Sequence, residues 1–320
     1  MTKTKTIIPD QNMILIDWLT FTSKCDSPES IKTMLGLEEV SWQVMEKGRN
    51  GYRQRWFFEN ISILFDGAEG MGVCVDITGT GCRAFETYST AVWEDLFFTL
   101  RSFPEDYNIT RLDMAFDEHI GILDIDVLRD DTDDHHYVSK SRTWMVQYGS
   151  AGTTIYHGSP KSNMYIRIYD KAAEQGLEDE HWIRVEMQMR DEIARGFADG
   201  LVTTSVGDQF RGVLHNYLRY VVPQTDTNMS RWPLTFYWDD LLEGVQKIRC
   251  WSCPGVNYDE WHLSDYIINQ TGNALDCYLH IFGVEDLIRE LGNRSIRKSP
   301  KYERLKAKYD NLKSGELDVC

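Results

Sequence analysis

The chain has 320 residues, of which 42% are hydrophobic and 26% are charged, a profile typical of a folded globular protein with a sizeable core. A formal net charge of −16 argues against a protein that coats nucleic acid through bulk positive charge. No uncharged apolar run approaches the roughly 18 residues that span a bilayer, and seven scattered cysteines do not resemble a disulfide framework. We therefore expect a cytoplasmic protein without membrane contact.

Short segments of alternating polarity dominate the first two thirds of the chain and are typical of β-strands. These segments lie at 14–22, 54–65, 72–78, 109–117, 153–157, 164–169 and 182–190. Helical spacing occurs between some of them, at 27–35, 91–103 and 191–203. This arrangement predicts an α+β fold in which a largely antiparallel sheet is flanked by helices.

Two polar segments in this region carry no predicted chemistry. The acidic run at 124–134 fits no calcium-binding spacing, so we interpret it as a solvated loop. The segment 79–83 contains Gly79 and Gly81 but lacks the third glycine of a dinucleotide-binding motif, and we interpret it as a turn.

The character of the sequence changes near residue 222, where alternation ends and polar residues and prolines cluster. We predict a first domain over 1–222 and a mainly helical C-terminal region over 223–320, with helices at 259–269, 274–291 and 300–312. Nine Lys or Arg residues face three acidic ones within 289–313, which makes this segment a candidate for DNA recognition, with a solvated helix surface as the alternative. Its cations include Arg297, Lys298, Lys301, Arg304, Lys306 and Lys308.

Three predicted strands have one polar and one apolar face, because side chains alternate with a period of two along a strand. If these strands are neighbours, one surface of the sheet collects their polar side chains. The polar positions are Tyr165, Arg167, Tyr169 and Lys171 in the first strand, Arg184, Glu186, Gln188 and Arg190 in the second, and Arg111, Asp113 and Asp117 in the third.

Such a surface would combine the groups needed to cut a phosphodiester. Asp113, Glu186 and Asp117 offer hard oxygen ligands for Mg²⁺ or Mn²⁺. Tyr169 offers an attacking oxygen, although a phenol of pKa near 10 needs a nearby metal or cations to ionise at neutral pH. Arg190 is a candidate DNA contact. Charge in the transition state would be stabilised by Arg167, Lys171 and Arg184.

The same pattern also fits a purely structural role, since an antiparallel sheet with one solvated face shows this alternation with charges paired across strands. Other chemistries are disfavoured. The chain has no Gly-x-x-x-x-Gly-Lys-Ser/Thr motif, so any DNA unwinding would need a partner helicase, and no Gly-x-Ser-x-Gly motif of the commonest hydrolases. Cys250 and Cys253 lack a second ligand pair, which favours buried thiols over zinc.

Five sequence blocks, in the expected order, resemble the replication initiation factor family. This family comprises rolling-circle plasmid initiators and related relaxases of conjugative elements and phages. The blocks lie at 16–22, 79–83, 110–117, 167–171 and 182–190, and the resemblance spans about residues 13–222.

The resemblance implies a catalytic relaxase-like nicking domain over 1–222, with Tyr169 as nucleophile and Asp113, Glu186 and Asp117 as metal-binding acids. It implies attack on origin DNA, as duplex or hairpin, that leaves a 5′-phosphotyrosine and a free 3′-hydroxyl to start rolling-circle replication or conjugative transfer. A host helicase and a homodimer are the implied protein partners. Two alternatives stay open: a DNA-binding regulator without catalysis, and a metal-dependent nuclease that uses water.

Overall fold

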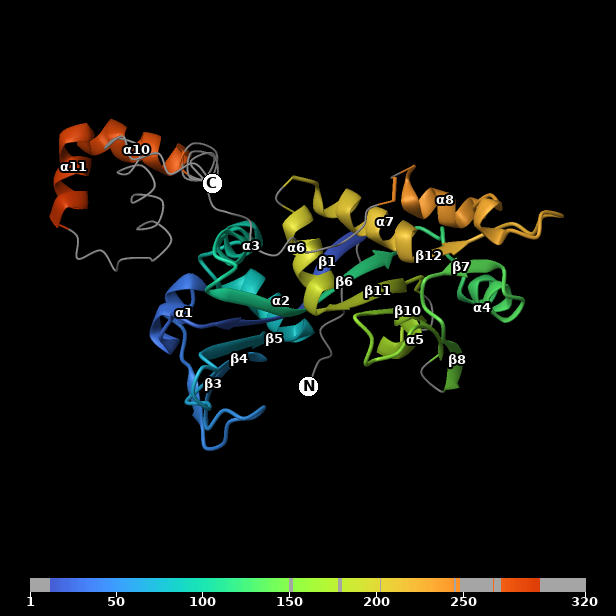
Figure 1. Ribbon diagram of the computed structural model, residues 1–320, viewed down its shortest axis with the longest axis horizontal. Helices are drawn as coiled ribbons and strands as arrows, with labels where there is room; N and C mark the ends of the chain where they lie inside the picture. Colours follow the sequence, from blue (N-terminus) through green and yellow to red (C-terminus); the bar gives the residue numbers. More distant parts are fainter. Residues whose placement is uncertain are drawn as a thin grey trace, which may run out of the picture. The chain divides into compact units, whose positions relative to one another are not determined.

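The computed structural model describes residues 12–149, 152–177, 180–201, 203–244, 246–247, 267 and 272–293. The chain divides into two compact units. One unit comprises Met1–Val92 and Asp106–Cys253, and the other comprises Trp93–Glu105 and Pro254–Cys320. Figure 1 labels most of the helices and strands of both.

Ten strands of the first unit form one sheet within the described residues, and every neighbouring pair runs antiparallel (Figure 1). This confirms the predicted α+β fold with an antiparallel sheet. A separate two-stranded ladder joins β7 (Tyr137–Ser139) to β12 (Leu218–Tyr220). The order in the large sheet is β2 (Gln43–Met45), β3 (Gln54–Phe58), β4 (Ile61–Phe65), β5 (Val73–Ile77), β1 (Met13–Ser23), β6 (Tyr107–Glu118), β11 (Ile183–Arg190), β10 (Met164–Asp170), β9 (Gly152–His157) and β8 (Trp144–Gly149).

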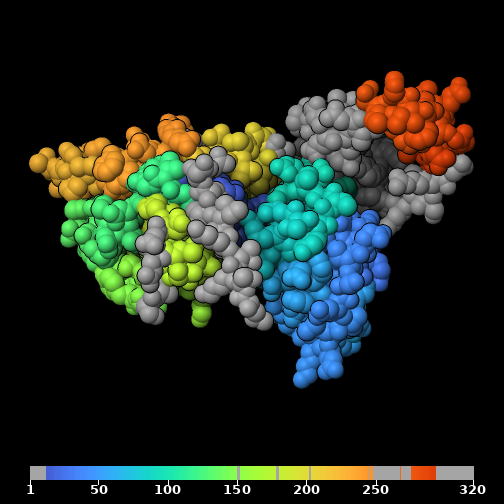
Figure 2. Space-filling view, turned by 180° about the vertical axis from the view of Figure 1, so that it is seen from behind, coloured from blue at the N-terminus to red at the C-terminus, as the bar shows by residue number. Residues whose placement is uncertain are grey.

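The β2–β3 edge of the sheet extends away from the rest of this unit. All three residues of β2 are exposed, and in the space-filling view of Figure 2 the blue residues of this edge project beyond their neighbours. A strand this short offers few free backbone groups for pairing with another chain.

One face of the central strands builds the core. Ile166 of β10 and Met187 of β11 are fully buried, as are the other apolar residues that alternate with the polar ones. The Phe116 ring of β6 stacks on Phe210 of α7 (Val206–Tyr217), with ring centroids 6.2 Å apart. The helix α6 (Asp191–Gly200) packs against β6 and β11. The opposite face is thereby left to the polar side chains.

Two segments predicted to be irregular are helices. α4 (Ile125–Asp133) occupies the acidic run, and the Asp124 carboxylate caps it by accepting the Asp126 N–H at 2.8 Å. α2 (Gly79–Tyr88) begins inside the predicted turn. Gly81 allows this helix to approach the sheet, because a Cβ at this position would lie 2.5 Å from the carbonyl oxygen of Asn60. The loop and turn predictions are therefore wrong.

The first unit continues past residue 222, where the sequence predicted a change of domain. Val221 pairs with Leu234 in an isolated β-bridge, and the buried Trp238 donates its Nε1–H to the Leu218 carbonyl at 3.3 Å. These contacts tie the following segment to the sheet, so the compact unit ends at Cys253. Its remaining helices are α1 (Pro28–Met34), α5 (Lys171–Gln175), the 3₁₀ helix η1 (Met229–Arg231) and α8 (Phe236–Leu242).

The second unit contains α3 (Trp93–Ser102), α10 (Gly272–Phe282) and α11 (Val284–Asn293). The helix predicted at 274–291 is therefore two helices, separated at Gly283, whose φ of 82° lies in the left-handed region. The helices predicted at 259–269 and 300–312 fall outside the described residues, apart from residue 267. Within the described parts of both units, no helix combines the length and the apolar character needed to span a membrane.

Candidate active site

The three strands predicted to carry a polar face are neighbours, in the order β6, β11 and β10. Their register places Tyr169 opposite Arg184, and Arg184 opposite Asp117. Two residues further along, Arg167 lies opposite Glu186. The polar side chains predicted from the alternation therefore share one face of the sheet.

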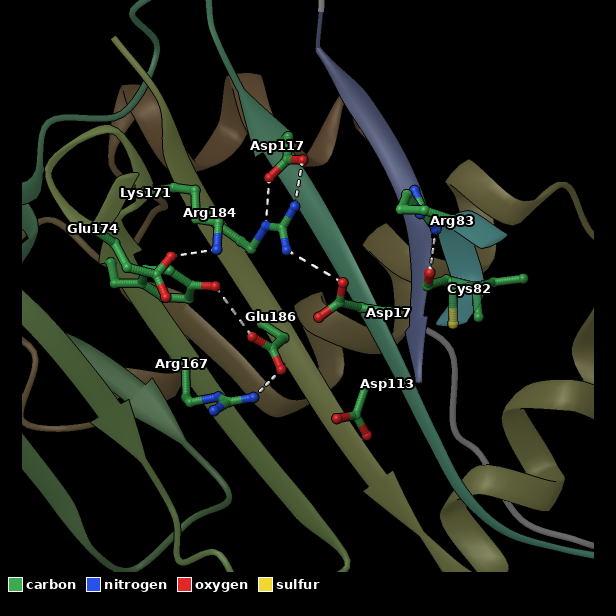
Figure 3. A network of polar contacts seen from close by, with 12 residues as sticks. Asp17, Cys82, Arg83, Asp113, Asp117, Arg167, Lys171, Glu174, Arg184 and Glu186 are labelled. Carbon is green, nitrogen blue, oxygen red and sulfur yellow. Dashed lines mark hydrogen bonds and ion pairs between the residues drawn. The ribbon is translucent and has the colours of Figure 1, made fainter. Parts of the chain in front are cut away.

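Two arginines hold the carboxylates of Asp117 and Glu186 on this face. Arg184 binds both oxygens of Asp117, with Nε–Oδ1 at 2.6 Å and Nη2–Oδ2 at 2.7 Å. Arg167 forms an ion pair with Glu186 (Figure 3). Charge-assisted bonds of this kind fix the orientation of both partners, so Glu186 and Arg184 occupy defined positions beside the phenol.

A further carboxylate, Asp17, belongs to this face and was missed by the sequence analysis. Its Oδ1 accepts a hydrogen bond from Nη1 of Arg184 at 3.3 Å, so that Arg184 lies between Asp17 and Asp117 (Figure 3). Gly79, the first residue of α2, lies close to Asp17, since a Cβ at position 79 would be 3.2 Å from Oδ1 of Asp17.

Asp17 reaches the polar face through a β-bulge in β1. The register pairs Ile16 with Met114 and Trp18 with Asp113, which leaves Asp17 as the additional residue. The buried positions of β1 change from even to odd numbers across this point. That change of parity is visible in the sequence and is the signal that indicates the bulge.

Tyr169 is the penultimate residue of β10, and its hydroxyl donates a long hydrogen bond of 3.5 Å to Oε2 of Glu186. Lys171 is the first residue of α5 and does not lie on the strand as the alternation predicted. Its ammonium group is 5.6 Å from the centroid of the Tyr169 ring and pairs with Glu174 (Figure 3). The phenol therefore has a carboxylate at its hydroxyl and a cation near its ring.

Burial raises the pKa of the Tyr169 hydroxyl above its usual 10, and the charge of Glu186 raises it further. Burial also raises the pKa of the Glu186 carboxyl to about 7, although the positive charge of Arg167 opposes this shift. The charges of Asp17 and Asp113 raise it as well. Glu186 therefore changes its charge near neutral pH, beside a phenol that stays protonated.

Tyr169 and Arg167 line a surface cavity of about 270 Å³. Its other walls include Gln147 of β8 and Thr154 and Tyr156 of β9. The Tyr156 hydroxyl donates to Oε1 of Gln147 at 3.2 Å. Tyr169 thus lines a space that a ligand can enter, together with hydrogen-bonding side chains of the neighbouring strands.

The three carboxylates predicted as metal ligands do not surround one point. Asp113 and Asp117 lie four residues apart on β6, about 13 Å along a strand that rises ~3.3 Å per residue. Asp113 instead pairs with Arg111, with Nη2–Oδ2 at 2.6 Å. Among the described residues, no group of three or more His, Cys, Asp or Glu side chains is placed to hold a metal ion. The set Asp113, Glu186 and Asp117 therefore does not fit a single ion in this structure.

Arg190, the predicted DNA contact on the sheet, is the last residue of β11 and lies opposite Arg111. Its Nε is buried and has no hydrogen-bond partner among the described residues. A spare guanidinium donor beside a second guanidinium is suited to a phosphate oxygen. The C-terminal candidates fall outside the described residues, namely Arg297, Lys298, Lys301, Arg304, Lys306 and Lys308.

Two family models match this chain. The model described as replication initiation factor matches residues 107–291, more than half of the chain. The chain belongs to the replication initiation factor family. A second model, described as rolling circle replication initiation protein N-terminal domain, matches residues 13–99. The second model therefore covers strands β1–β5 of the sheet, and the first model covers the strands from β6 onward.

Two relatives resemble this chain over most of its length. The chain is 25% identical over 267 residues to the candidate DNA relaxase NicK of Bacillus subtilis (strain 168), which covers 76% of this chain and 74% of that protein. It is 30% identical to the solved structure of a rolling circle replication initiator protein from Geobacillus stearothermophilus, with a TM-score of 0.69. That match covers 76% of this chain and 100% of the other. The family expected from the sequence blocks is thereby confirmed.

Proposed function

We propose that this replication initiation factor nicks one strand of origin DNA at a specific site and rejoins it, with Tyr169 as the nucleophile. The family and the two relatives support a nicking role in rolling-circle replication or conjugative transfer. The assignment of Tyr169 rests on its position, because its hydroxyl contacts Glu186 and the residue lines the 270 Å³ cavity together with Arg167.

The reaction uses the groups around Tyr169. Its oxygen attacks the scissile phosphorus while the phenol proton passes to Oε2 of Glu186. The bond from phosphorus to the 3′ oxygen breaks, and that oxygen takes a proton from water, which leaves a 5′-phosphotyrosine and a free 3′-hydroxyl. The covalent intermediate conserves the energy of the phosphodiester, so the reverse reaction rejoins the strand without ATP.

The two arginines have different tasks in this reaction. The Nε of Arg167 is buried without a hydrogen-bond partner among the described residues, so it has a donor available for a phosphoryl oxygen. Arg184 already donates from Nε, Nη1 and Nη2 to Asp117 and Asp17. We assign it to holding a fixed positive charge opposite Tyr169.

A requirement for Mg²⁺ or Mn²⁺ belongs to this proposal, as does recruitment of a helicase and formation of a homodimer. The described residues present no three-ligand group, so the reaction above assigns no step to a metal ion. The chain has no nucleoside-triphosphate-binding motif, so a partner would have to unwind the DNA.

A supercoiled plasmid that carries the cognate origin tests the proposal. Incubation with the protein and Mg²⁺ should relax the plasmid and leave protein covalently attached to a 5′ end. Tyr169→Phe should form no adduct, whereas the matched control Tyr165→Phe, on the same strand, should nick normally. Full nicking by Tyr169→Phe would contradict the assignment of Tyr169 as the nucleophile.

Two other outcomes separate the alternatives. A nicked plasmid with a free 5′-phosphate and no protein adduct would indicate a nuclease that uses water. Specific binding of the origin without any cleavage would indicate a regulator that has kept the fold but not the reaction.

A further inference from the structure

We propose that a second cavity in the first unit binds a backbone phosphate of the duplex that flanks the nick. This inference rests on the proposed function, because it places DNA outside the cutting site. The cavity has a volume of about 310 Å³. Its lining includes Lys140, Ser141, Arg142, Ser159, Ser162 and Tyr217.

Two adjacent loops build this phosphate cavity. One follows β7 and carries residues 140–143, and the other joins β9 to β10 and carries residues 158–162. The Gly158 N–H donates to the Thr143 carbonyl at 2.7 Å and so joins the loops. Gly158 has a φ of 101°, and a Cβ there would lie 2.9 Å from the Met164 carbonyl oxygen, so glycine is needed for this close approach.

Serine side chains fix the shape of the second loop. Ser162 Oγ accepts the Ser159 N–H at 3.1 Å and donates to the Met164 carbonyl at 2.7 Å. The Lys161 N–H in turn donates to Ser159 Oγ at 3.3 Å. A loop already held in this way loses little conformational freedom when a ligand binds.

The charged residues among the described lining of the phosphate cavity are cations. Lys140, Arg142 and Lys161 are exposed, and among the described residues that line the cavity there is no Asp or Glu. Burial lowers the pKa of Lys247, and the positive charges of Arg219 and Lys140 lower it further. These cations repel one another, and a bound anion would relieve that repulsion. Such a cluster on a chain of net charge −16 is therefore a candidate anion site.

The fixed position of Lys140 suits a backbone phosphate of the DNA that this chain is proposed to cut. Lys140 Nζ donates to Asn216 Oδ1 at 2.7 Å and lies 5.0 Å from the centroid of the Tyr217 ring, so the ammonium group is held in place. Met164, which also lines the cavity, is five residues before Tyr169 on β10. This separation is about 17 Å along the strand at ~3.3 Å per residue, and the side chains of Met164 and Tyr169 lie on opposite faces of it.

Two double variants that each remove two positive charges provide the test. Lys140→Ala/Arg142→Ala changes the cavity, and Lys47→Ala/Arg53→Ala removes two exposed cations near the projecting β2–β3 edge (Figure 2). Both are made in Tyr169→Phe, so that bound DNA is not cut. Fluorescence anisotropy then measures the affinity for a labelled origin duplex over a series of salt concentrations.

Each neutralised phosphate contributes about 0.9 to the slope of log K against log salt concentration. The cavity variant should therefore lower the magnitude of this slope by about 1, and the control variant should leave it unchanged. The loss should be the same on a scrambled duplex, because backbone contacts do not read sequence. Arg142→Glu alone leaves the contacts of Lys140 in place and should also weaken the binding of duplex DNA at low salt, because it lowers the charge by two as well.

Equal slopes for the two double variants would overturn the proposal. A second result would also overturn it. If the duplex slope stays unchanged and inorganic phosphate raises the Tm of the parent protein but not of the cavity variant, the cavity binds a free anion and not DNA. Binding by Tyr169→Phe needs no chemistry, so this test holds even if the wild-type protein does not nick. Nicking with an unchanged slope would refute the phosphate cavity alone.

Discussion

The hydroxyl of Tyr169 lies 3.5 Å from Oε2 of Glu186, and the other oxygen of Glu186 is held by Arg167. The two residues come from adjacent strands and are diagonal neighbours, because the register pairs Tyr169 with Arg184 and Arg167 with Glu186. A phenol that holds its proton thus faces a carboxyl that titrates near neutral pH. Transfer of the phenol proton to this carboxyl gives the reaction a measurable pH dependence.

Adduct formation should require ionised Glu186. Burial raises the pKa of this carboxyl to about 7, so at lower pH it carries a proton and cannot accept one from Tyr169. The single-turnover rate of adduct formation should therefore rise as the pH increases through about 7. Glu186→Gln should be slow at every pH and lack this rise. A wild-type-like profile in Glu186→Gln would contradict the assigned role.

Asp17→Asn should move the same pH profile to lower pH. The charge of Asp17 raises the pKa of Glu186, so its removal lets Glu186 ionise at lower pH. Arg184 keeps both bonds to Asp117, which preserves the fold. The midpoint of the acidic limb is the measurement, with the exposed Asp66→Asn as control. A shift toward higher pH in Asp17→Asn would refute the coupling.

Asp117 should matter for stability. Its carboxylate is 4% exposed and binds the guanidinium of Arg184, which is 8% exposed. Asp117→Ala leaves that buried charge without its main partner and should lower the free energy of unfolding by about 3–5 kcal/mol. Asp66→Ala, which breaks the exposed pair with Arg53, should cost about 0–1 kcal/mol. Urea unfolding measures both, and equal losses would contradict the structural role of Asp117.

A metal requirement should involve Asp113 without Asp117. Nicking should stop in a chelator and return with Mg²⁺ or Mn²⁺. Asp113→Asn should raise the metal concentration needed for half-maximal nicking, whereas Asp117→Asn should not, since the two residues are about 13 Å apart along β6. If Asp117→Asn raises the metal concentration for half-maximal nicking as much as Asp113→Asn does, the ligand set predicted from the sequence is correct. The arrangement with the ion bound would then differ from the structure described above.

Glu118 should stabilise the fold at neutral pH and less so in acid. Burial would raise its pKa, but hydrogen bonds from His181 and from backbone N–H groups, including that of Leu123, outweigh this and lower it. Stability from a lowered carboxyl pKa is present above the unfolded pKa and is lost as the pH falls through the folded pKa. The Tm difference between wild type and Glu118→Gln should therefore shrink in acid. A constant difference would contradict the linkage.

The sequence by itself determined the strands of the site and the face on which their polar residues lie. Alternation placed Tyr169, Arg167, Arg184 and Glu186 together because the period of a strand is a local property of the backbone. The ordered motif blocks were also sufficient to indicate the family, which the comparisons confirm.

Only the tertiary structure decided which charges meet. The bulge brings Asp17 to Arg184, and the register brings Glu186 within reach of Tyr169. Strand order, register and bulges arise from pairing between residues far apart in the chain, so no local pattern specifies them in full. The pairing of Glu186 with Arg167 and of Asp117 with Arg184 follows from the same long-range contacts.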